Sequence, residues 1–370
     1  MIASSDFFDQ IKAAMHSKTP FVLFTKPSQE SVKAYVQCDK NSYVIEDFTE
    51  SGFVFAPFNQ GSKTYYIPAD KSTFLELDKS EFEVSGLSAK PETSQTSTHA
   101  DLVTKAIDEI NSTDLQKVVL SRFIKVELEE QNPLHIFKKL AAKYTTAFSY
   151  CWYHPQTGFW LGASPECLLK LNGRSLTTMA LAGTQDLQKS PAVQWDDKNL
   201  NEHAFVTDYL LEVLSQYLEA VKTSGPNTLR AGHLLHLQTV VTGRLRPGKN
   251  ALKQLIRTLH PTPAVCGTPR PLALDFINAH EAYDREYYTG FFGELNSPEN
   301  TPFRNSKKNI ENRAYRLNQF STDLAVNLRC MKLMDTIAIL YSGGGITKDS
   351  SPKDECTEII NKMHTVKSVL

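Results

Sequence analysis

The sequence lacks a run of one charge sign, a spaced cysteine motif and a long apolar stretch, and each absence excludes a class of protein. Its 40 basic and 41 acidic residues nearly balance, so we expect no nucleic-acid partner and no binding to an anionic membrane surface. The six cysteines have no Cys-x-x-Cys spacing, which is typical of reduced thiols rather than of a disulfide framework or a zinc site. No stretch reaches the roughly 20 apolar residues of a membrane-spanning helix. Residues 1–18 carry charges where a signal peptide needs an apolar run, and we therefore expect a cytoplasmic protein.

What the chain does have is length and apolar content. With 370 residues, 41% of them hydrophobic, it is able to bury about three quarters of its unfolded surface, which favours one large domain or two closely packed lobes. Ser, Thr and Pro accumulate between residues 85 and 98, which indicates a connecting loop. We place a boundary there, between a β-rich amino-terminal section at 1–90 and a larger section at 98–370. No apolar heptad pattern is present, and we expect a monomer.

Hydrophobic patterns predict helices and strands in both sections. Short β-type runs follow a predicted first helix at Phe7–His16, so the amino-terminal section is expected to be mostly strand. Beyond the loop, predicted helices at 101–110 and 133–144 are interleaved with strands. Apolar residues at helical spacing predict a long helix from about 197 to 221. Further strands are expected at 117–128, 235–245 and 324–333.

The segment from 341 to 362 is the most informative part of the chain. A helix is expected to begin there, with Ser351 as its cap, Pro352 at its first position and Asp354 completing a capping box. Gly343, Gly344 and Gly345 precede this helix. They predict a glycine turn whose backbone N–H groups are able to approach an anion.

Three charged residues of the predicted helix lie on one face. Glu355, Glu358 and Lys362 fall within an arc of roughly 60° at helical spacing. The two carboxylates suit a hard cation, and the ammonium group suits an organic carboxylate. Together they favour a site for a metal-bound acidic small molecule. A lone Glu-x-x-Glu is more often part of a solvated helix surface, but the glycine run shifts the balance because such a surface does not need one.

A lysine and a glutamate elsewhere are candidate base and acid. Lys117 shares one strand face with Val119 and Ser121, a setting that favours a neutral amine able to act as a general base. Glu166 follows Pro165 at a predicted turn into an apolar strand, where a raised pKa would let its carboxyl serve as an acid. Taken alone, an edge-strand lysine that reaches solvent and an exposed turn glutamate are the commoner outcomes.

Two further segments are open to two interpretations. Lys198 and Glu202 lie four residues apart at the start of the long predicted helix. They can form a surface ion pair of little energetic weight, or Glu202 can give the cation a third oxygen. The segment at 259–270 is too rich in proline and too apolar for a passive linker, and a packed structural loop is about as favoured as a functional one.

In this order the segments resemble the chorismate-utilising enzymes, a family that includes isochorismate synthase, salicylate synthase, anthranilate synthase component I and aminodeoxychorismate synthase component I. The resemblance runs from about residue 98 to the end of the chain. Its blocks are KVVLSR, GASPECLL, LAGT, KNLNEH, HLQTVVTGRL, HPTPAVCGTPR, YDREYYTGFFG, LAVNLR and YSGGGI with DECTEIINK. It implies a large two-lobed α+β fold in which layered antiparallel sheets, flanked by helices, enclose one active site.

The resemblance also implies a Mg²⁺ ion between enzyme carboxylates and the ring carboxylate of chorismate. Glu202 and Glu358 are the implied ligands, with Glu355 near the ion. Asn199 stands where relatives usually have an acidic residue, which removes one candidate outer carboxylate. The implied substrate-binding groups are Lys362, Arg329, Tyr288, Gly343, Gly344 and Gly345 around the enolpyruvyl carboxylate, and Gly183, Thr184 and His236 at the ring end.

Chemistry separates the branches of this family. Water addition at ring carbon 2 with loss of hydroxide from carbon 4 needs a base and an acid, and Lys117 and Glu166 match these roles. The anthranilate branch uses ammonia and typically lacks a lysine at the first position. The aminodeoxychorismate branch commonly carries a nucleophilic lysine where this chain has Ala182, which leaves direct attack by water. The loop at 259–270 is also of the isochorismate synthase type.

The sequence therefore predicts an isochorismate synthase, an isomerase that converts chorismate reversibly and depends on Mg²⁺. Salicylate synthase, which goes on to eliminate pyruvate, shares Lys117, Glu166 and the metal site and stays open as the alternative. A silent paralogue that only binds chorismate is disfavoured, because the catalytic and metal-binding residues are intact. The product would serve menaquinone or catecholate siderophore biosynthesis, and the sequence favours neither.

Overall fold

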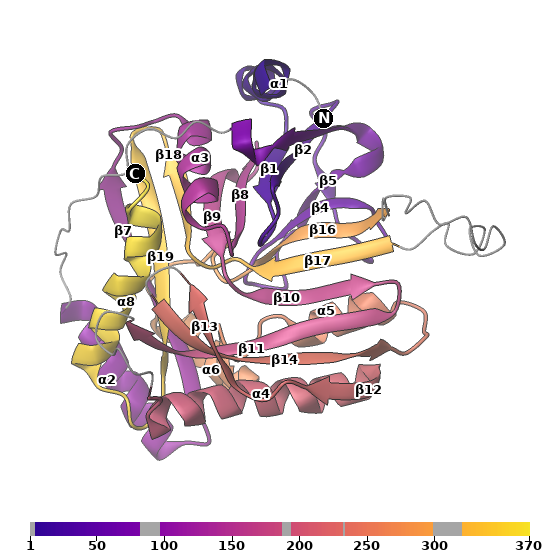
Figure 1. The fold of residues 1–370 in the computed structure, drawn as a ribbon. Helices are drawn as coiled ribbons and strands as arrows, with labels where there is room; N and C mark the ends of the chain where they lie inside the picture. The colour runs from indigo at the N-terminus through magenta and orange to yellow at the C-terminus, as the bar shows by residue number, and fades with distance from the viewer. Residues whose placement is uncertain (1–3, 82–96, 187–193, 232–233, 299–319) are drawn as a thin grey trace.

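The structure, a computed structural model, describes residues 4–81, 97–186, 194–231, 234–298 and 320–370. Within these ranges the chain forms two large antiparallel sheets with helices around them, as the α+β prediction requires (Figure 1). The predicted boundary loop at 85–98 lies almost wholly outside the described residues. None of the helices in the described ranges combines the length and apolar content needed to cross a bilayer.

The first sheet contains the strand of Lys117. Its strands, in spatial order, are β15 (Gly267–Thr268), β7 (Lys117–Glu127), β19 (Ile337–Ile346), β18 (Cys330–Met334), β9 (Gly158–Ser164), β8 (Phe148–His154), β1 (Phe21–Thr25), β2 (Ser31–Gln37) and β6 (Ser72–Asp78). Every neighbouring pair is antiparallel. Strands from both ends of the chain are therefore hydrogen-bonded into one sheet.

The second sheet carries the LAGT and HLQTVV segments on adjacent strands. Its order is β12 (Leu218–Thr223), β14 (Leu234–Leu245), β11 (Ser175–Asp186), β10 (Cys167–Asn172), β17 (Phe320–Val326), β16 (Phe291–Pro298), β4 (Gly52–Ala56), β5 (Tyr65–Pro68) and β3 (Tyr43–Val44), while β13 (Asn227–Ala231) also pairs with β14. The amino-terminal section thus adds strands to both sheets and shares their cores.

Helices flank both sheets. They are α1 (Ser4–Ser17), α2 (Ser97–Ser112), α3 (Pro133–Lys143), α4 (Asp197–Tyr217), α5 (Ala251–Leu259), α6 (Arg270–His280) and α8 (Pro352–Lys367), with short 3₁₀ turns at Ala69–Lys71 and Lys79–Glu81. In Figure 1, α4 runs along β14 and β12, and α8 runs beside β19. On α4, the apolar positions Val206, Leu210 and Leu214 recur every four residues and are buried against the second sheet.

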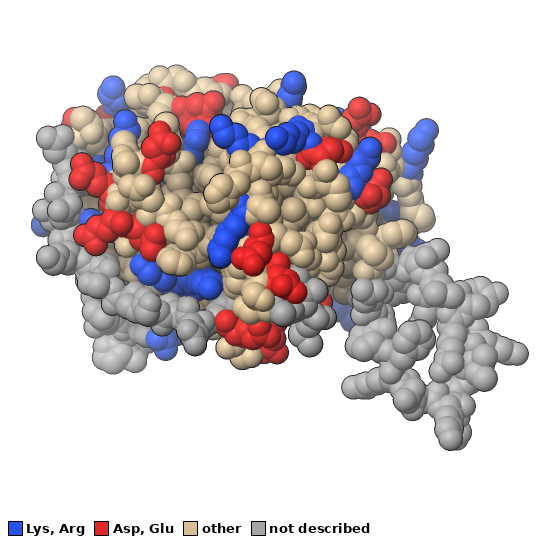
Figure 2. Space-filling view, turned by 90° about the horizontal axis from the view of Figure 1, so that it is seen from above, with Lys and Arg blue, Asp and Glu red and all other residues tan. Residues whose placement is uncertain are grey.

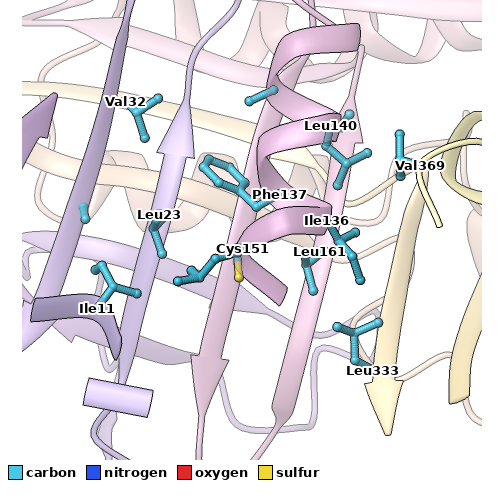
Figure 3. Packing of buried hydrophobic residues seen from close by; sticks show 14 of the residues in the cluster. Ile11, Leu23, Val32, Ile136, Phe137, Leu140, Cys151, Leu161, Leu333 and Val369 are labelled. Atoms are coloured by element: carbon cyan, nitrogen blue, oxygen red, sulfur yellow. The ribbon is translucent and has the colours of Figure 1, made fainter. Parts of the chain in front are cut away.

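Separate apolar cores stabilise these layers. Figure 3 shows one of them, in which Phe137 and Leu140 of α3 pack over Leu23, Cys151 and Leu161 of the first sheet. An aromatic core, including Phe55, Trp152, Trp160, Tyr287 and Phe292, contains side chains from both sheets. Aromatic side chains bury about 150–250 Å² each, so this core contributes strongly to holding the sheets together.

The surface carries mixed charge. Figure 2 shows lysine and arginine side chains interspersed with acidic side chains on one face of the molecule. This mixture follows from the near-equal numbers of basic and acidic residues, 40 and 41.

Some sequence predictions need correction. The helix predicted to reach residue 221 ends at Tyr217, and Leu218–Thr223 form β12, which pairs with β14. The strand predicted at 324–333 is two strands, β17 and β18, in different sheets. Ser351 occupies the predicted cap position of α8, but its side chain makes no capping hydrogen bond. Periodicity alone does not reveal where a strand changes sheets.

Candidate active site

One pocket contains most of the predicted site residues. It lies between β7 and β19 of the first sheet and β11 and β14 of the second, with side chains from α4 and α8. The predicted residues in its wall are Glu166, Gly183, Thr184, Glu202, His236, Tyr288, Arg329, Gly343, Gly345 and Lys362. Ala264 and Val265 of the proline-rich loop also line it, so this loop is part of the site as well as packed structure. Lys117, Gly344, Glu355 and Glu358 do not line the pocket.

The three successive glycines belong to a strand and not to the predicted turn. Gly343, Gly344 and Gly345 lie in β19 and pair with residues 119–121 of β7. A Cβ atom at position 345 would overlap the Glu202 carboxylate, and a Cβ atom at position 343 would lie 3.0 Å from the Tyr288 hydroxyl. The glycines therefore let side chains of other elements approach the backbone of β19 closely.

Lys117 lies behind Glu202 as seen from the pocket. Its side chain is fully buried, and its Nζ atom is 3.0 Å from Oε1 of Glu202. Thr268 pairs with Lys117 across β15 and β7, so the proline-rich loop supports this strand. The sequence predicted apolar neighbours on the strand, but the partner of the amine is a carboxylate that comes from α4.

Glu166 lies where the chain passes from the first sheet to the second, between β9 and β10. Its backbone carbonyl accepts a hydrogen bond from Val326 N at 3.0 Å, which fixes this crossing. Burial raises the pKa of the Glu166 carboxyl to about 8, although the charges of Lys117 and Lys362 act in the opposite direction. Both lysines are thus close enough to act on it. At neutral pH the carboxyl is mostly protonated and able to donate a proton.

Each of the predicted metal-ligand carboxylates is paired with a lysine. The pairs are Glu202 with Lys117 at 3.0 Å, Glu358 with Lys362 at 2.5 Å, and Glu355 with Lys198 at 2.5 Å. The predicted surface pair of Lys198 with Glu202 does not form, because Lys198 reaches across to α8 instead. The four-residue spacing suggested Glu202 as a partner of Lys198, but the partner in the structure is Glu355.

The two carboxyls on α8 have opposite electrostatic settings. Burial and the charge of Glu358 raise the pKa of Glu355 to about 7, although Lys198 opposes this rise. Burial also opposes ionisation of Glu358, but Lys362, Lys198 and Arg329 together hold its pKa below the ordinary value. Glu358 is therefore an anion at neutral pH. Its negative charge disfavours ionisation of the neighbouring Glu355 carboxyl.

The donor atoms fit a hard cation in part. Among the described residues, no three His, Cys, Asp or Glu side chains form a metal-binding group. However, Oε2 of Glu355 is buried without a hydrogen-bond partner among the described atoms. The Cβ position of Gly344 is 3.3 Å from that oxygen and 3.9 Å from Oε1 of Glu358, so the two carboxylates converge on one space. Mg²⁺ is usually held by one or two protein carboxylates, with substrate and water completing its shell, and this pair fits that pattern.

Arg329 and Tyr288 form a cationic and polar part of the wall. Arg329 has a positive φ of 49° in the connection from β17 to β18, and its Nη1 atom is buried without a hydrogen-bond partner among the described atoms. Burial lowers the pKa of Arg329 to about 10, so it is still charged at neutral pH. Tyr288 stacks on Tyr341 with ring centroids 5.4 Å apart. A buried guanidinium beside a phenol is suited to an organic carboxylate.

The opposite wall is built on a bulge of β11. The register with β14 shifts between Ala182 and Thr184, and Gly183 has a φ of 76° that glycine adopts without strain. Thr184 N donates to Oδ1 of Asn199 at 3.0 Å. Asn199, where an acidic residue was expected, therefore anchors the bulge. His236 contacts the carbonyl of Gly183 through Nδ1 at 3.1 Å, and burial lowers the pKa of its ring to about 3, so it is neutral.

A buried ion pair missed by the sequence analysis supports the site from behind. Arg285 and Glu281 are almost fully buried and 2.5 Å apart. Arg285 also donates to the carbonyls of Val119 at 2.7 Å and Val265 at 2.9 Å, while Glu281 accepts from the hydroxyl of Ser121. The pair joins β7 to the proline-rich loop. In the sequence, Arg285 is part of the YDREYY segment and Glu281 lies two residues before that segment, and nothing marked the two as a pair.

The chain matches the sequence model of a family described as chorismate binding enzyme, over residues 65–305 and 316–370. It is 27% identical over 274 residues to the vibriobactin-specific isochorismate synthase of Vibrio cholerae, a match that covers 71% of this chain and 64% of that protein. It is 30% identical over 283 residues to the isochorismate synthase MenF of Escherichia coli, covering 73% of this chain and 58% of that protein. The matches thus span less than two thirds of the length of these relatives.

The fold is also that of a solved relative. The structure of the menaquinone-specific isochorismate synthase MenF from Escherichia coli superposes with a TM-score of 0.74 at 22% identity, covering 95% of this chain and 88% of that chain. This likeness supports the two-sheet architecture described above.

Proposed function

Since the chain belongs to the chorismate-binding enzymes, we propose that it is an isochorismate synthase, an isomerase that converts chorismate to isochorismate. The observation that carries the proposal is the placement of a protonated carboxyl, Glu166, within electrostatic reach of the buried amine of Lys117. Exchange of a hydroxyl between two ring carbons requires an acid and a base, and here the acid is in the pocket wall while the amine lies behind Glu202 of that wall.

The reaction is balanced by these two groups. In the proposed step, the Lys117 amine accepts a proton from water while the water oxygen bonds to ring carbon 2. The ring double bonds shift, and the bond from carbon 4 to its hydroxyl breaks. Glu166 donates a proton to the departing oxygen, so one water molecule enters and one leaves. Lys117 and Glu166 come from different segments, β7 and the β9–β10 crossing, which allows them to act at different ring positions.

Binding is assigned to the remaining wall. Arg329, Lys362 and Tyr288 would hold the enolpyruvyl carboxylate, because they offer two cations and a hydroxyl to one region of the pocket. Glu355 and Glu358, whose carboxylates converge on one space, would hold Mg²⁺ near the ring carboxylate. Glu202 pairs with Lys117 and forms no three-carboxylate group with them among the described residues. Such an ion would neutralise that carboxylate and polarise the ring. Gly183, Thr184 and His236 would contact the ring end.

Salicylate synthase is the second candidate, because it needs the same acid, base and metal site. It differs by a further step that eliminates pyruvate. Ala264 and Val265 give the proline-rich loop an apolar surface in the pocket with no acid or base of its own. The identity of the product separates the two candidates.

The proposal is tested by incubating the protein with chorismate and Mg²⁺ and identifying the products by chromatography and mass spectrometry. Isochorismate in equilibrium with chorismate is expected. Salicylate with pyruvate would instead establish the second candidate. Unchanged chorismate that nevertheless binds would show a protein without this activity. The relatives include one named as vibriobactin-specific and one described as menaquinone-specific, and we assign no single pathway to the product of this chain.

A further inference from the structure

Asn327 is a fully buried amide next to the pocket but outside its wall. Its side chain accepts a hydrogen bond from the hydroxyl of Tyr150 at 2.6 Å and donates one to the carbonyl of Tyr287 at 2.8 Å. Its backbone N–H donates to the carbonyl of Gly290 at 2.8 Å, and its carbonyl accepts from Thr289 N at 2.9 Å. Asn327 therefore joins its own segment to residues 287–290 through the side chain and the backbone together.

Each of the two joined segments presents a group to the pocket. Tyr288 lies between Tyr287 and Thr289, which both contact Asn327. Arg329 follows Asn327 by two residues in the sequence, and both Tyr288 and Arg329 line the pocket. Both segments are irregular, since they lie between strands and both Thr289 and Arg329 have a positive φ. The β16–β17 ladder ends at the pair Phe291 and Val326, and the bonds of Asn327 continue the pairing from there to residues 287–290.

The chemistry of the side chain suits this role. An asparagine amide donates and accepts at once, and both of its contacts here are shorter than 3 Å. Tyr150 belongs to β8 in the first sheet, so the phenol ties the amide to a rigid element. An apolar residue of similar size would leave the Tyr150 hydroxyl and the Tyr287 carbonyl without their partner.

We propose that Asn327 is a positioning residue for substrate binding, which sets the spacing between Tyr288 and Arg329 so that both reach one carboxylate. This inference rests on the proposed function, in which these two groups hold the enolpyruvyl carboxylate. That carboxylate keeps its charge throughout the reaction. Weaker contacts from Tyr288 and Arg329 to this carboxylate therefore reduce binding of the substrate and of the transition state equally. The expected result is a higher KM with no decrease in kcat.

The test compares Asn327→Ala and Tyr150→Phe with wild type. Asn327→Ala is expected to raise both the Kd and the KM for chorismate about tenfold, with kcat nearly unchanged. Tyr150→Phe leaves the asparagine in place and is expected to raise them less. Thr178→Val is the matched control, because the Thr178 hydroxyl also makes a buried hydrogen bond, to Leu168 O at 2.6 Å, outside the pocket wall. It is expected to lower the free energy of unfolding while leaving KM unchanged.

A chorismate analogue with its enolpyruvyl carboxylate converted to an amide separates positioning from a general loss of stability. Wild type is expected to bind it more weakly than chorismate, and Asn327→Ala is expected to lose little further affinity. An unchanged KM in Asn327→Ala, or an equal loss of affinity for chorismate and for the amide, would overturn the inference. If Asn327→Ala does not fold, the same comparison with Tyr150→Phe decides. A wild type that binds chorismate without converting it would refute the proposed function, while the Kd values would still test Asn327.

Discussion

Replacing Glu166 by glutamine should remove activity and at the same time stabilise the protein at alkaline pH. Glutamine keeps the shape of the protonated carboxyl but has no acidic proton to give the leaving hydroxyl. Loss of a general acid typically lowers turnover by about 10²- to 10⁴-fold, and we expect this loss in kcat with little change in KM. Wild-type activity should itself fall as the pH rises through about 8, because the carboxyl ionises there.

The stability effect follows from the direction of the pKa shift. Burial raises the pKa of Glu166 from 4.5 to about 8, so the folded protein binds this proton more tightly than the unfolded chain does. The contribution is fully present below pH 4.5 and is lost as the pH rises through about 8. The whole shift corresponds to at most roughly 4 to 5 kcal/mol of unfolding free energy. Glutamine cannot ionise, so the free energy of unfolding of the variant does not decrease in this way at high pH.

Denaturant unfolding of wild type and Glu166→Gln at pH 5, 7 and 9 measures the effect. The free energy of unfolding of the variant should exceed that of wild type at pH 9, and the difference should shrink towards pH 5. Glu212→Gln, on an exposed position of α4, is the control and should show no such pH dependence. A Glu166→Gln variant that is less stable than wild type at pH 9, or an active one, would refute the reasoning.

Three other substitutions test the rest of the site. Lys117→Ala should abolish turnover while chorismate still binds in a calorimetric titration, and a variant that keeps most of its rate would remove this residue as the base. Glu358→Gln should raise the Mg²⁺ concentration needed for half-maximal activity by about tenfold or more, and an unaltered metal dependence would exclude it as a ligand. Gly345→Ala should lower kcat strongly, because a Cβ atom there would collide with Glu202 and the side chain of Lys117. Gly248→Ala, whose Cβ atom would meet only ordinary contacts, is its control and should be fully active.

Local signals in the sequence predicted most helices and strands, because apolar periodicity and proline positions act over a few residues. α3, for example, begins at Pro133 as predicted and ends at Lys143, one residue before the predicted end. The same signals failed where a long-range contact decides the structure. Three successive glycines alone indicated a turn. They are in strand β19 because each of them pairs with a residue of β7.

The sequence indicated which residues lie at the pocket more fully than it indicated which side chains contact one another. Most of the residues carried over from the family motifs line one pocket. The pairing of Lys198 with Glu355 and of Lys117 with Glu202 joins residues 157 and 85 positions apart in sequence, which helical spacing cannot reveal. Asn327 was also missed, because its role comes from hydrogen bonds to residues on other elements.

The most direct test of the account is conversion of chorismate in H₂¹⁸O. If water activated by Lys117 attacks carbon 2 directly, each isochorismate formed should carry one ¹⁸O atom in its carbon 2 hydroxyl, as read by mass spectrometry and by NMR isotope shifts. Isochorismate without the label would mean that the hydroxyl moves within the substrate. That result would contradict the roles given to Lys117 and Glu166.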